Sequence, residues 1–382
     1  MMTYCTSCLL PSTKPDLSFN EDGMCAACLA YQNRKEVDWA QREIEFSDIT
    51  NKFRKKSSSG WDCLIPVSGG KDSTAQVLKV LEYGLKPLCV TATTCDLSEI
   101  GRSNILNIRE LGVDAIELSP NPRVRRLLNR FGLEEVGDIS WPEHVGIFTI
   151  PVRVAAAFDV PLIIWGENSQ HEYGGPALAQ ESKHLNRAWL EEFGGLLGLR
   201  VTDLKDHVDA TEQDLTYYNY PSDVELESAG VTGIFLGYFF PWDGLGNTLI
   251  SQSHGFKSFG QRVEGSMVDY ENLDNYQTGI HDYFKYLKYG FGRTTDIASL
   301  HIRRGRLTRS QGLEIVKKFD GNFPWTYLDK PLAKILEPLE ISIDEFLKIC
   351  DQFTNKSLFQ IDSSGNIIRN RDHSPIKQNY DN

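Results

Sequence analysis

The segment Ser-Gly-Gly-Lys-Asp-Ser at residues 68–73 constrains the fold of this chain more than any other feature. It follows the short apolar run at residues 63–67 and precedes residues 75–81, where apolar positions recur with helical spacing. Glycines let the backbone approach an anion closely, and free N–H groups at a helix N-terminus attract phosphate. The order strand, glycine-rich loop, helix therefore predicts a phosphate-binding loop inside an α/β fold.

The side chains of this loop suit nucleotide chemistry. Lys71 brings a positive charge, Ser68 and Ser73 bring hydroxyl donors, and Asp72 is suited to hold Mg²⁺ beside phosphates. The pattern is neither a Walker A loop nor a dinucleotide fingerprint. It resembles the PP-loop of the ATP pyrophosphatase superfamily, whose members split ATP between the α and β phosphates and attach AMP to a substrate oxygen. An ordinary glycine-rich turn is the alternative.

Two cysteine pairs occupy the N-terminal segment. Cys5-x₂-Cys8 and Cys25-x₂-Cys28 are separated by sixteen residues, a spacing typical of zinc sites. Four thiolates complete a tetrahedron and leave no open position, so we expect a structural zinc ion. A redox pair, free thiols and an iron–sulfur cluster remain alternatives.

The other cysteines occur singly. We expect Cys63, Cys89 and Cys350 in the core. Cys95 follows the second expected strand, and it is the one cysteine for which a catalytic role is considered.

Short apolar strands alternate with helical segments after residue 59. The expected strands are 63–67, 88–92, 115–118 and 162–165, and the expected helices are 75–81, 100–111 and 152–158. This alternation predicts βαβ units and a parallel sheet covered on both faces. The fold class is therefore α/β, a Rossmann-like parallel sheet of the PP-loop ATP pyrophosphatase type, with an N-terminal zinc-ribbon-like head and a helical C-terminal region.

Four regions follow from these patterns. Residues 1–58 form the zinc-binding head and one linker helix over 31–58, and residues 59–175 form the PP-loop core. Residues 176–280 are rich in Gly, Tyr, Asp and Phe with weak periodicity, which predicts an insertion of loops and short helices for substrate or partner contacts. Residues 281–382 are helical with a polar tail, and Thr308 and Gln311 form a capping box.

Ligands of open α/β sheets bind beyond the carboxyl ends of the strands. The corresponding positions for ATP, besides the loop itself, are Pro66, Thr91, Thr93, Gly166 and Glu167. Glu167 is a candidate second Mg²⁺ ligand, and a plain surface turn is the alternative for residues 166–168.

A family resemblance rests on several motifs, the most specific being Trp-Gly-Glu-Asn at residues 165–168 and Glu-Tyr-Gly-Gly at 172–175. The others are the zinc head, the PP-loop, and residues 38–39, 99–102, 118–122 and 141–147. Together they resemble the N-acetyl sugar amidotransferases of bacterial surface-polysaccharide and flagellin-sugar biosynthesis, which act on lipopolysaccharide O-antigen and nonulosonic acid sugars. Val145 departs from the pattern, where a small alanine is expected.

The resemblance implies that ATP adenylates the oxygen of an N-acetyl amide, that ammonia displaces AMP, and that an acetamidino group results. Lys71 and the loop amides would stabilise pyrophosphate, while Asp72 and Glu167 would hold magnesium. His144 and Glu172 are candidate bases, with a packed structural histidine as the alternative for His144. The implied substrate contacts are Trp141, His144, Asn168, Glu172 and Tyr173.

The source of ammonia is expected to lie outside this chain. Its cysteines lack the Gly-x-Cys-x-Gly neighbours of a class I glutaminase, and the first cysteine is Cys5 rather than the N-terminal cysteine of a class II glutaminase. The resemblance implies a separate glutaminase subunit with a cyclase-like channel subunit.

Two other functions compete with this one. A PP-loop enzyme that thiolates tRNA would want a basic face and further cysteines, whereas the formal net charge is −12. An ATP-binding zinc scaffold without turnover would be expected to lose Lys71 and Asp72. We expect no nucleic-acid partner, no membrane span and a cytoplasmic location, because an apolar signal region and long apolar runs are lacking.

Overall fold

The computed structural model describes residues 2–34, 37–166, 184–185, 208–222, 224–226 and 230–378. At its centre lies a sheet with the strand order β3-β2-β1-β4-β6-β5. Its parallel strands are β1 (Cys63–Pro66), β2 (Pro87–Ala92), β3 (Asp114–Leu118), β4 (Leu162–Trp165) and β6 (Thr232–Phe235). The two-residue β5 (His184–Leu185) pairs antiparallel at the edge. The predicted α/β class with a parallel sheet is confirmed.

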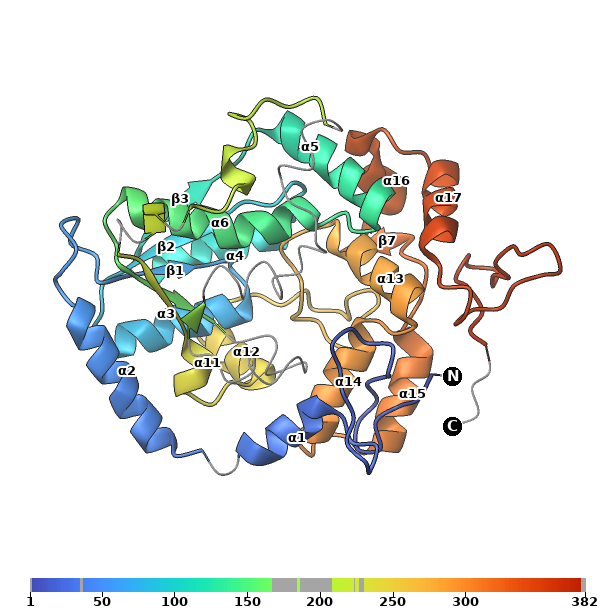
Figure 1. The fold of residues 1–382 in the computed structure, drawn as a ribbon, viewed down its shortest axis with the longest axis horizontal. Coiled ribbons are helices and arrows are strands. Elements are labelled where there is room, and N and C mark those ends of the chain that lie inside the picture. The colour runs from blue at the N-terminus through green and yellow to red at the C-terminus, as the bar shows by residue number, and fades with distance from the viewer. Residues whose placement is uncertain are drawn as a thin grey trace.

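Helices cover both faces of the sheet (Figure 1). Alternate residues of β1 point to opposite faces, so Ile65 packs in the core formed with α2 (Trp39–Phe53) and α3 (Lys71–Glu82). Leu64 packs in the core formed with α6 (Trp141–Ala157). The central strands β1 and β4 are almost wholly apolar because both of their faces are buried, whereas β3 carries Asp114 and Glu117 and is more exposed.

The segment between β3 and α6 holds two further elements. α5 (Pro122–Phe131) starts at a proline and is capped by Asn121. A π-helical turn (Gly132–Val136) follows and ends at Gly137 in the left-handed conformation. α4 (Glu99–Glu110), capped by Ser98, connects β2 to β3.

The linker region differs from its prediction as a single helix over 31–58. α1 (Ala26–Asn33) ends early, and α2 starts anew at Trp39. Asp38 accepts a hydrogen bond from the backbone N–H of Gln41. The break is local, because this N-cap interaction starts a new helix that the apolar periodicity alone does not reveal.

The predicted insertion over 176–280 proves to be partly a component of the core. β6 joins the sheet beside β4, and a short helix, α11 (Leu236–Phe239), follows it. α12 (Gly244–Gln252) packs against α3, and the Ser251 hydroxyl donates to the backbone carbonyl of Lys71 at 2.7 Å. A 3₁₀ turn, Thr216–Tyr218, packs near α6.

The C-terminal region is helical, as predicted. Its helices are α13 (Thr278–Tyr289), α14 (Arg293–Arg303), α15 (Arg309–Phe319), α16 (Leu332–Leu336), a 3₁₀ turn (Glu337–Leu339) and α17 (Ile343–Phe353). A small hairpin joins β7 (Thr326–Tyr327) to β8 (Lys330–Pro331). The capping box of Thr308 and Gln311 is confirmed.

Within the part of the chain that the structure describes, every helix is too short or too polar to cross a lipid bilayer.

Candidate functional site

The predicted phosphate loop links β1 to α3. Gly69 has φ +80°, and a Cβ there would lie 2.6 Å from the backbone nitrogen of Ile105 on α4. Only glycine fits this position, because a side chain would meet both the steric limit of left-handed backbone and the neighbouring helix. Gly70 is the N-cap residue of α3, and its carbonyl accepts hydrogen bonds from the hydroxyls of Ser73 and Thr74, both at 3.0 Å.

The loop lies where the strand order reverses. β1 has β2 on one side and β4 on the other, which is the switch point at which open α/β sheets bind ligands. A cavity of about 620 Å³ opens there. The predicted residues that it brings together are Pro66, Ser68, Asp72, Ser73, Thr91, His144 and Gly166.

A second cavity of about 230 Å³ lies along the same loop. Gly69, Gly70 and Lys71 line it together with residues 270–274. Asp274 and Arg293 line both cavities. The two spaces therefore adjoin at the loop, one reaching toward the strand ends and the other toward the C-terminal region.

Lys71 is almost fully buried and sits between two carboxylates. Its ammonium lies 2.7 Å from Asp72 Oδ2 and 2.7 Å from Glu271 Oε1. Burial disfavours the charged form, but these two carboxylates outweigh that effect and raise the pKa of Lys71 well above its usual value. Lys71 thus stays cationic at any working pH and is suited to contact phosphate.

Asp72 is held in place from its other side. Asn247 on α12 donates to Asp72 Oδ1 at 2.8 Å, while Oδ2 contacts Lys71. Helix α12, which the sequence placed in an insertion, thereby orients a residue of the phosphate loop.

Arg293 is the other cation of the site. It forms a two-pronged ion pair with Asp282, through Nη2 to Oδ1 at 2.9 Å and Nε to Oδ2 at 3.2 Å. The nearby Asp274 is partly buried, and its burial raises the pKa of its carboxyl. Arg293 and Asp274 therefore bring a cation and a carboxyl group of raised pKa to the walls of both cavities.

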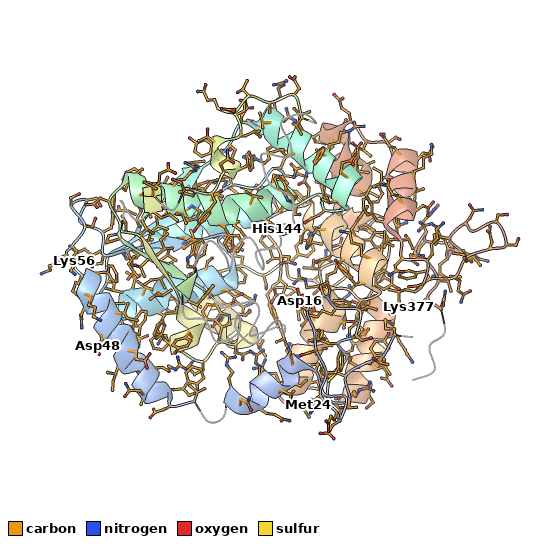
Figure 2. All side chains as sticks on the ribbon, in the orientation of Figure 1. Asp16, Met24, Asp48, Lys56, His144 and Lys377 are labelled. Atoms are coloured by element: carbon orange, nitrogen blue, oxygen red, sulfur yellow. The ribbon has the colours of Figure 1, made fainter. Side chains whose placement is uncertain are left out.

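His144 lines the larger cavity and belongs to a cluster that the sequence did not reveal. Asp138 Oδ2 lies 3.3 Å from His144 Nδ1, and Asp138 Oδ1 lies 2.7 Å from His281 Nδ1. The two imidazole rings meet edge to face with centroids 4.9 Å apart. Figure 2 shows His144 on α6 where that helix approaches the C-terminal helices.

Two predicted site residues are placed elsewhere. Trp141 is fully buried in a core with Val124 and Leu128, so it supports α6 rather than contacting a substrate in the cavity. The carbonyl of Thr93 accepts a hydrogen bond from Arg125, and the neighbouring Thr94 lines the cavity in its place. Neither Trp141 nor Thr93 lines either cavity, so their roles as substrate and ATP contacts stay predictions.

Four further predicted residues lie outside the described residues: Glu167, Asn168, Glu172 and Tyr173. Their roles as Mg²⁺ ligand, substrate contacts and base stay predictions.

Sequence reasoning missed the residues that come from far along the chain, namely Asp138, Glu271, Asp274, His281 and Arg293. They occur singly, without a motif around them. The fold brings Glu271, Asp274 and Arg293 to the loop, and it brings Asp138 and His281 to His144, so no local pattern would have identified them.

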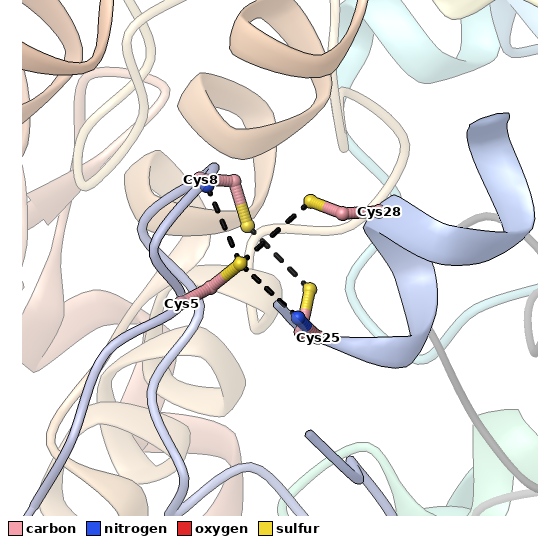
Figure 3. Close-up of side chains that lie close together, drawn as sticks. All are labelled: Cys5, Cys8, Cys25 and Cys28. Atoms are coloured by element: carbon pink, nitrogen blue, oxygen red, sulfur yellow. Dashed lines mark hydrogen bonds between the residues drawn. The ribbon is translucent and has the colours of Figure 1, made fainter. Parts of the chain in front are cut away.

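The four N-terminal cysteines converge as predicted (Figure 3). The Sγ atoms of Cys5 and Cys28 are 3.8 Å apart, and those of Cys8 and Cys25 are 3.7 Å apart. A tetrahedral zinc ion with Zn–S bonds of about 2.3 Å requires separations of about 3.8 Å. The donor set and its spacing therefore fit zinc.

Backbone groups support this cluster as well. Cys5 Sγ accepts hydrogen bonds from the N–H groups of Ser7, Cys8 and Cys25. Such bonds stabilise thiolates, the form in which cysteine binds metal.

The cysteine head packs against the C-terminal helices rather than against the sheet. Leu9 N–H donates to the Ser299 hydroxyl at 3.2 Å, and Arg309 Nε donates to the carbonyl of Cys8 at 3.1 Å. Figure 1 shows the head beside α14 and α15. Its place is structural, and it lies apart from the loop after β1.

The single cysteines are placed as expected. Cys63, Cys89 and Cys350 are fully buried. Cys95 does not line either cavity described above, and its N–H donates to Glu143 Oε1 at 3.2 Å. Burial, followed by the Glu143 carboxylate, raises the pKa of the Cys95 thiol to about 12. A thiol that stays protonated is a poor nucleophile, so the site offers no activated cysteine among the described residues.

Residues 256–371 match the model of a protein family described as "LPS biosynthesis protein WbpG-like, C-terminal domain". The matched segment contributes Glu271, Asp274, His281 and Arg293 to the site.

Among solved structures, the chain is similar to the NMN synthetase from Francisella tularensis, with 14% identity and a TM-score of 0.28 over 50% of this chain and 90% of that chain. A comparison with curated proteins finds no match.

Proposed function

We propose that this protein is an AMP-forming amidotransferase of bacterial surface-sugar biosynthesis. It adenylates the oxygen of an N-acetyl group on a sugar and replaces it with ammonia, which gives an acetamidino group. The observation that carries the proposal is the loop at residues 68–73, built on a left-handed Gly69 at the switch point of a parallel sheet and open to a cavity of about 620 Å³.

The first half of the reaction forms an activated amide. The amide oxygen attacks the α-phosphorus of ATP, the bond to the β-phosphate oxygen breaks, and pyrophosphate leaves. The amide nitrogen releases its proton to solvent, so the activated amide is an O-adenylyl imidate without an N–H proton. Lys71 and the N–H groups that open α3 compensate the charge that builds up on the departing phosphates. Arg293 reaches both cavities and is suited to contact the same anion.

Asp72 and Glu271 are suited to hold magnesium. Both carboxylates contact the Lys71 ammonium, so they lie close to one another. Magnesium is typically bound by one or two carboxylates plus phosphate oxygens, and it neutralises phosphate charge when bound. The sequence suggests Glu167 as a second magnesium ligand. Among the described residues, Glu271 is the carboxylate that we propose for this role.

The second half of the reaction uses the difference between two leaving groups. An amide oxygen leaves very poorly, whereas AMP leaves readily. The larger cavity would hold the sugar and exclude water, so that ammonia rather than hydroxide reaches the activated carbon. The walls suited to an acetamido group are apolar, formed by Ile147, Phe148 and Trp165.

The sugar class rests on two supports. Residues 256–371 match a model whose name refers to lipopolysaccharide biosynthesis, and the motifs of residues 1–175 resemble the N-acetyl sugar amidotransferases. We further propose that ammonia comes from a separate glutaminase subunit with a cyclase-like channel subunit. The four buried cysteines near the N-terminus, Cys5, Cys8, Cys25 and Cys28, would hold a structural zinc ion.

The test is incubation of the purified protein with ATP, Mg²⁺, ammonium and a panel of N-acetylated nucleotide sugars and nonulosonic acids. We expect AMP and pyrophosphate only with one sugar, and a product whose mass differs by the exchange of O for NH. ATP cleavage that tRNA stimulates, with no sugar product, would instead favour a tRNA-modifying enzyme. Binding of ATP without AMP formation across the panel would favour a scaffold.

A further inference from the structure

A single buried carboxylate contacts two histidines, of which His144 lines the larger cavity. Asp138 is only 4% exposed. Its Oδ1 contacts His281 Nδ1 at 2.7 Å and its Oδ2 contacts His144 Nδ1 at 3.3 Å. His144 lies on α6, which packs against the sheet. His281 lies in the first turn of α13, within the segment that matches the lipopolysaccharide-biosynthesis family model.

The backbone fixes this carboxylate firmly. Ser140 N–H donates to Asp138 Oδ1 at 3.0 Å, and Asp138 N–H donates to the carbonyl of Gly132 at 2.9 Å. A Cβ on Gly132 would lie 2.5 Å from the Asp138 carbonyl oxygen, and Gly137 has φ +63° with α17 packed against it. The turn therefore tolerates no side chain at either glycine, and Asp138 has one position.

The shorter contact, between Asp138 and His281, indicates a hydrogen bond rather than two ligands of one metal ion, whereas the 3.3 Å between Asp138 and His144 fits either arrangement. Two ligands on one tetrahedral ion at about 2.0–2.1 Å lie about 3.3 Å apart. The 2.7 Å between Asp138 Oδ1 and His281 Nδ1 is shorter than that and is typical of a charged hydrogen bond. The carboxylate then fixes the proton of each neutral ring on Nδ1, which leaves Nε2 to accept a proton.

The charges around His144 favour its protonated form. Asp138 and Glu143 on the one side attract a proton, whereas Arg293 from α14 opposes it. Burial alone would lower the pKa of His144, but the Asp138 carboxylate outweighs it and the pKa is raised. His281 also faces Asp138, and Lys288 on α13 lies near enough to influence the same carboxylate. A base whose pKa is raised by a neighbouring carboxylate is suited to take a proton from ammonium.

We propose that His144 is the base that takes a proton from ammonium in the cavity, and that Asp138 and His281 are positioning residues that hold its ring. This inference rests on the proposed function. The proton passes from ammonium to His144 Nε2, and the lone pair that is freed forms the new C–N bond. The C–O bond to AMP breaks with its electrons on the phosphate, and the amidine keeps the remaining three protons as an amidinium ion.

The experiment has one arm that does not depend on activity. Nitrogen chemical shifts of ¹⁵N-histidine-labelled protein report which ring nitrogen carries the proton. We expect Nδ1–H in both His144 and His281, with the preference lost in Asp138→Asn. Bound divalent metal that is present beyond the cysteine cluster and absent in both His144→Gln and His281→Asn would overturn the proposal.

The second arm measures AMP formation with ammonium as the nitrogen source across pH. We expect His144→Gln to lower kcat by about 10²-fold or more, with the KM for ATP retained. Asp138→Asn should lower kcat less and move the acidic limb of the profile to lower pH, because His144 loses the carboxylate that raises its pKa. Asp351→Asn, which removes a surface ion pair with Arg369, should keep the wild-type profile.

The outcomes separate the two levels of inference. Wild-type kcat in His144→Gln, in a protein that forms AMP with a sugar, would refute the base and leave the proposed function standing. If no sugar yields AMP, the proposed function fails and the base assignment fails with it, whatever the nitrogen shifts report about Asp138.

Discussion

Glu271 lies 2.7 Å from the ammonium of Lys71 and connects the loop after β1 to the segment that precedes α13. The same ammonium contacts Asp72, so the lysine of the phosphate loop has two anionic partners. The ammonium has three N–H donors, so two carboxylates leave one donor for a phosphate, and the same two carboxylates are suited to hold the magnesium ion that a nucleotide brings.

Replacement of Glu271 tests this arrangement. Glu271→Gln removes one of the two carboxylates and leaves the Lys71–Asp72 contact in place. We expect the Mg²⁺ concentration for half-maximal AMP formation to rise about tenfold or more, because a charge about 4 Å from a divalent ion is worth several kcal/mol at the effective dielectric of a protein surface. Glu314→Gln, on the exposed face of α15, is the control. An unchanged Mg²⁺ requirement would exclude Glu271 as a ligand.

Gly69→Ala should damage the loop more than its backbone angle alone requires. Gly60 has φ +90° with no atom within 4 Å of a built Cβ, whereas Gly69 has φ +80° and meets Ile105. Gly60→Ala therefore costs about 1 kcal/mol for the left-handed backbone. Gly69→Ala costs about 1–3 kcal/mol more from overpacking. Chemical denaturation measures both, and equal losses of stability would show that the loop can move away from α4.

The cysteine cluster should bind zinc as a unit. Cys5→Ser removes the sulfur that accepts three backbone N–H groups, so we expect the purified variant to lose its zinc and to unfold at a lower temperature. Cys350→Ser alters a fully buried cysteine outside the cluster and should retain zinc even if its stability falls. Elemental analysis by mass spectrometry distinguishes the two. Zinc retained at full level in Cys5→Ser would contradict the tetrahedral site.

The thiol of Cys95 should have low reactivity toward alkylating reagents. Because burial and Glu143 raise its pKa to about 12, the thiol stays protonated at pH 8 and should react slowly with iodoacetamide in the folded protein. Cys95→Ala should form AMP at close to the wild-type rate. Rapid alkylation that abolishes activity would revive the sulfur-transfer alternative.

Asp138→Asn should destabilise the protein in a pH-dependent manner. The lowered pKa of Asp138 means that its contribution is present above an unfolded-state pKa of about 3.9. The raised pKa of His144 means that its contribution is present below an unfolded-state pKa of about 6.5 and is lost as pH rises through the folded value. Both contributions coincide between about pH 4 and 6.5. We expect a loss of about 3 kcal/mol near pH 6 and a smaller loss at pH 9, measured by denaturant unfolding.

A loss of stability that does not vary with pH would indicate that Asp138 acts through packing and its backbone contacts alone. His281→Asn is the matched variant for the same unfolding measurement. It removes one imidazole and keeps a hydrogen-bond donor near Asp138.

Most of the sheet and the phosphate loop could be predicted because local sequence patterns mark them. The strands β1, β2 and β4 are short, mostly apolar runs, β3 alternates apolar and acidic residues, and Gly69 and Lys71 belong to a contiguous motif. The strand β6 was missed because Thr-Gly-Ile-Phe is brief and lies in a stretch of weak periodicity. Its identity as a strand depends on the partner β4, which a local pattern does not report.

Of the residues around the phosphate loop, those of the loop itself could be predicted from the sequence. Asp72 and Ser73 follow from the motif, whereas Glu271 and Arg293 reach the loop through the packing of the C-terminal region. His144 was singled out for its neighbours in sequence, but Asp138, which orients it, precedes it by a tight turn whose geometry rests on Gly132 and Gly137. Trp141, which the resemblance suggests as a substrate contact, is fully buried, and a sequence motif does not report such burial.

The docking of the cysteine head has a consequence for biosynthesis. Ser299 and Arg309 form hydrogen bonds with Leu9 and Cys8 of the head. Both are translated long after the head has left the ribosome. Metal can gather the four thiolates early, but the head then waits with its docking face uncovered until α14 and α15 have emerged. Loss of metal during that interval would expose thiols to oxidation while no helix covers them, so zinc supply in the cell should affect the yield of folded protein more than the stability of the finished molecule.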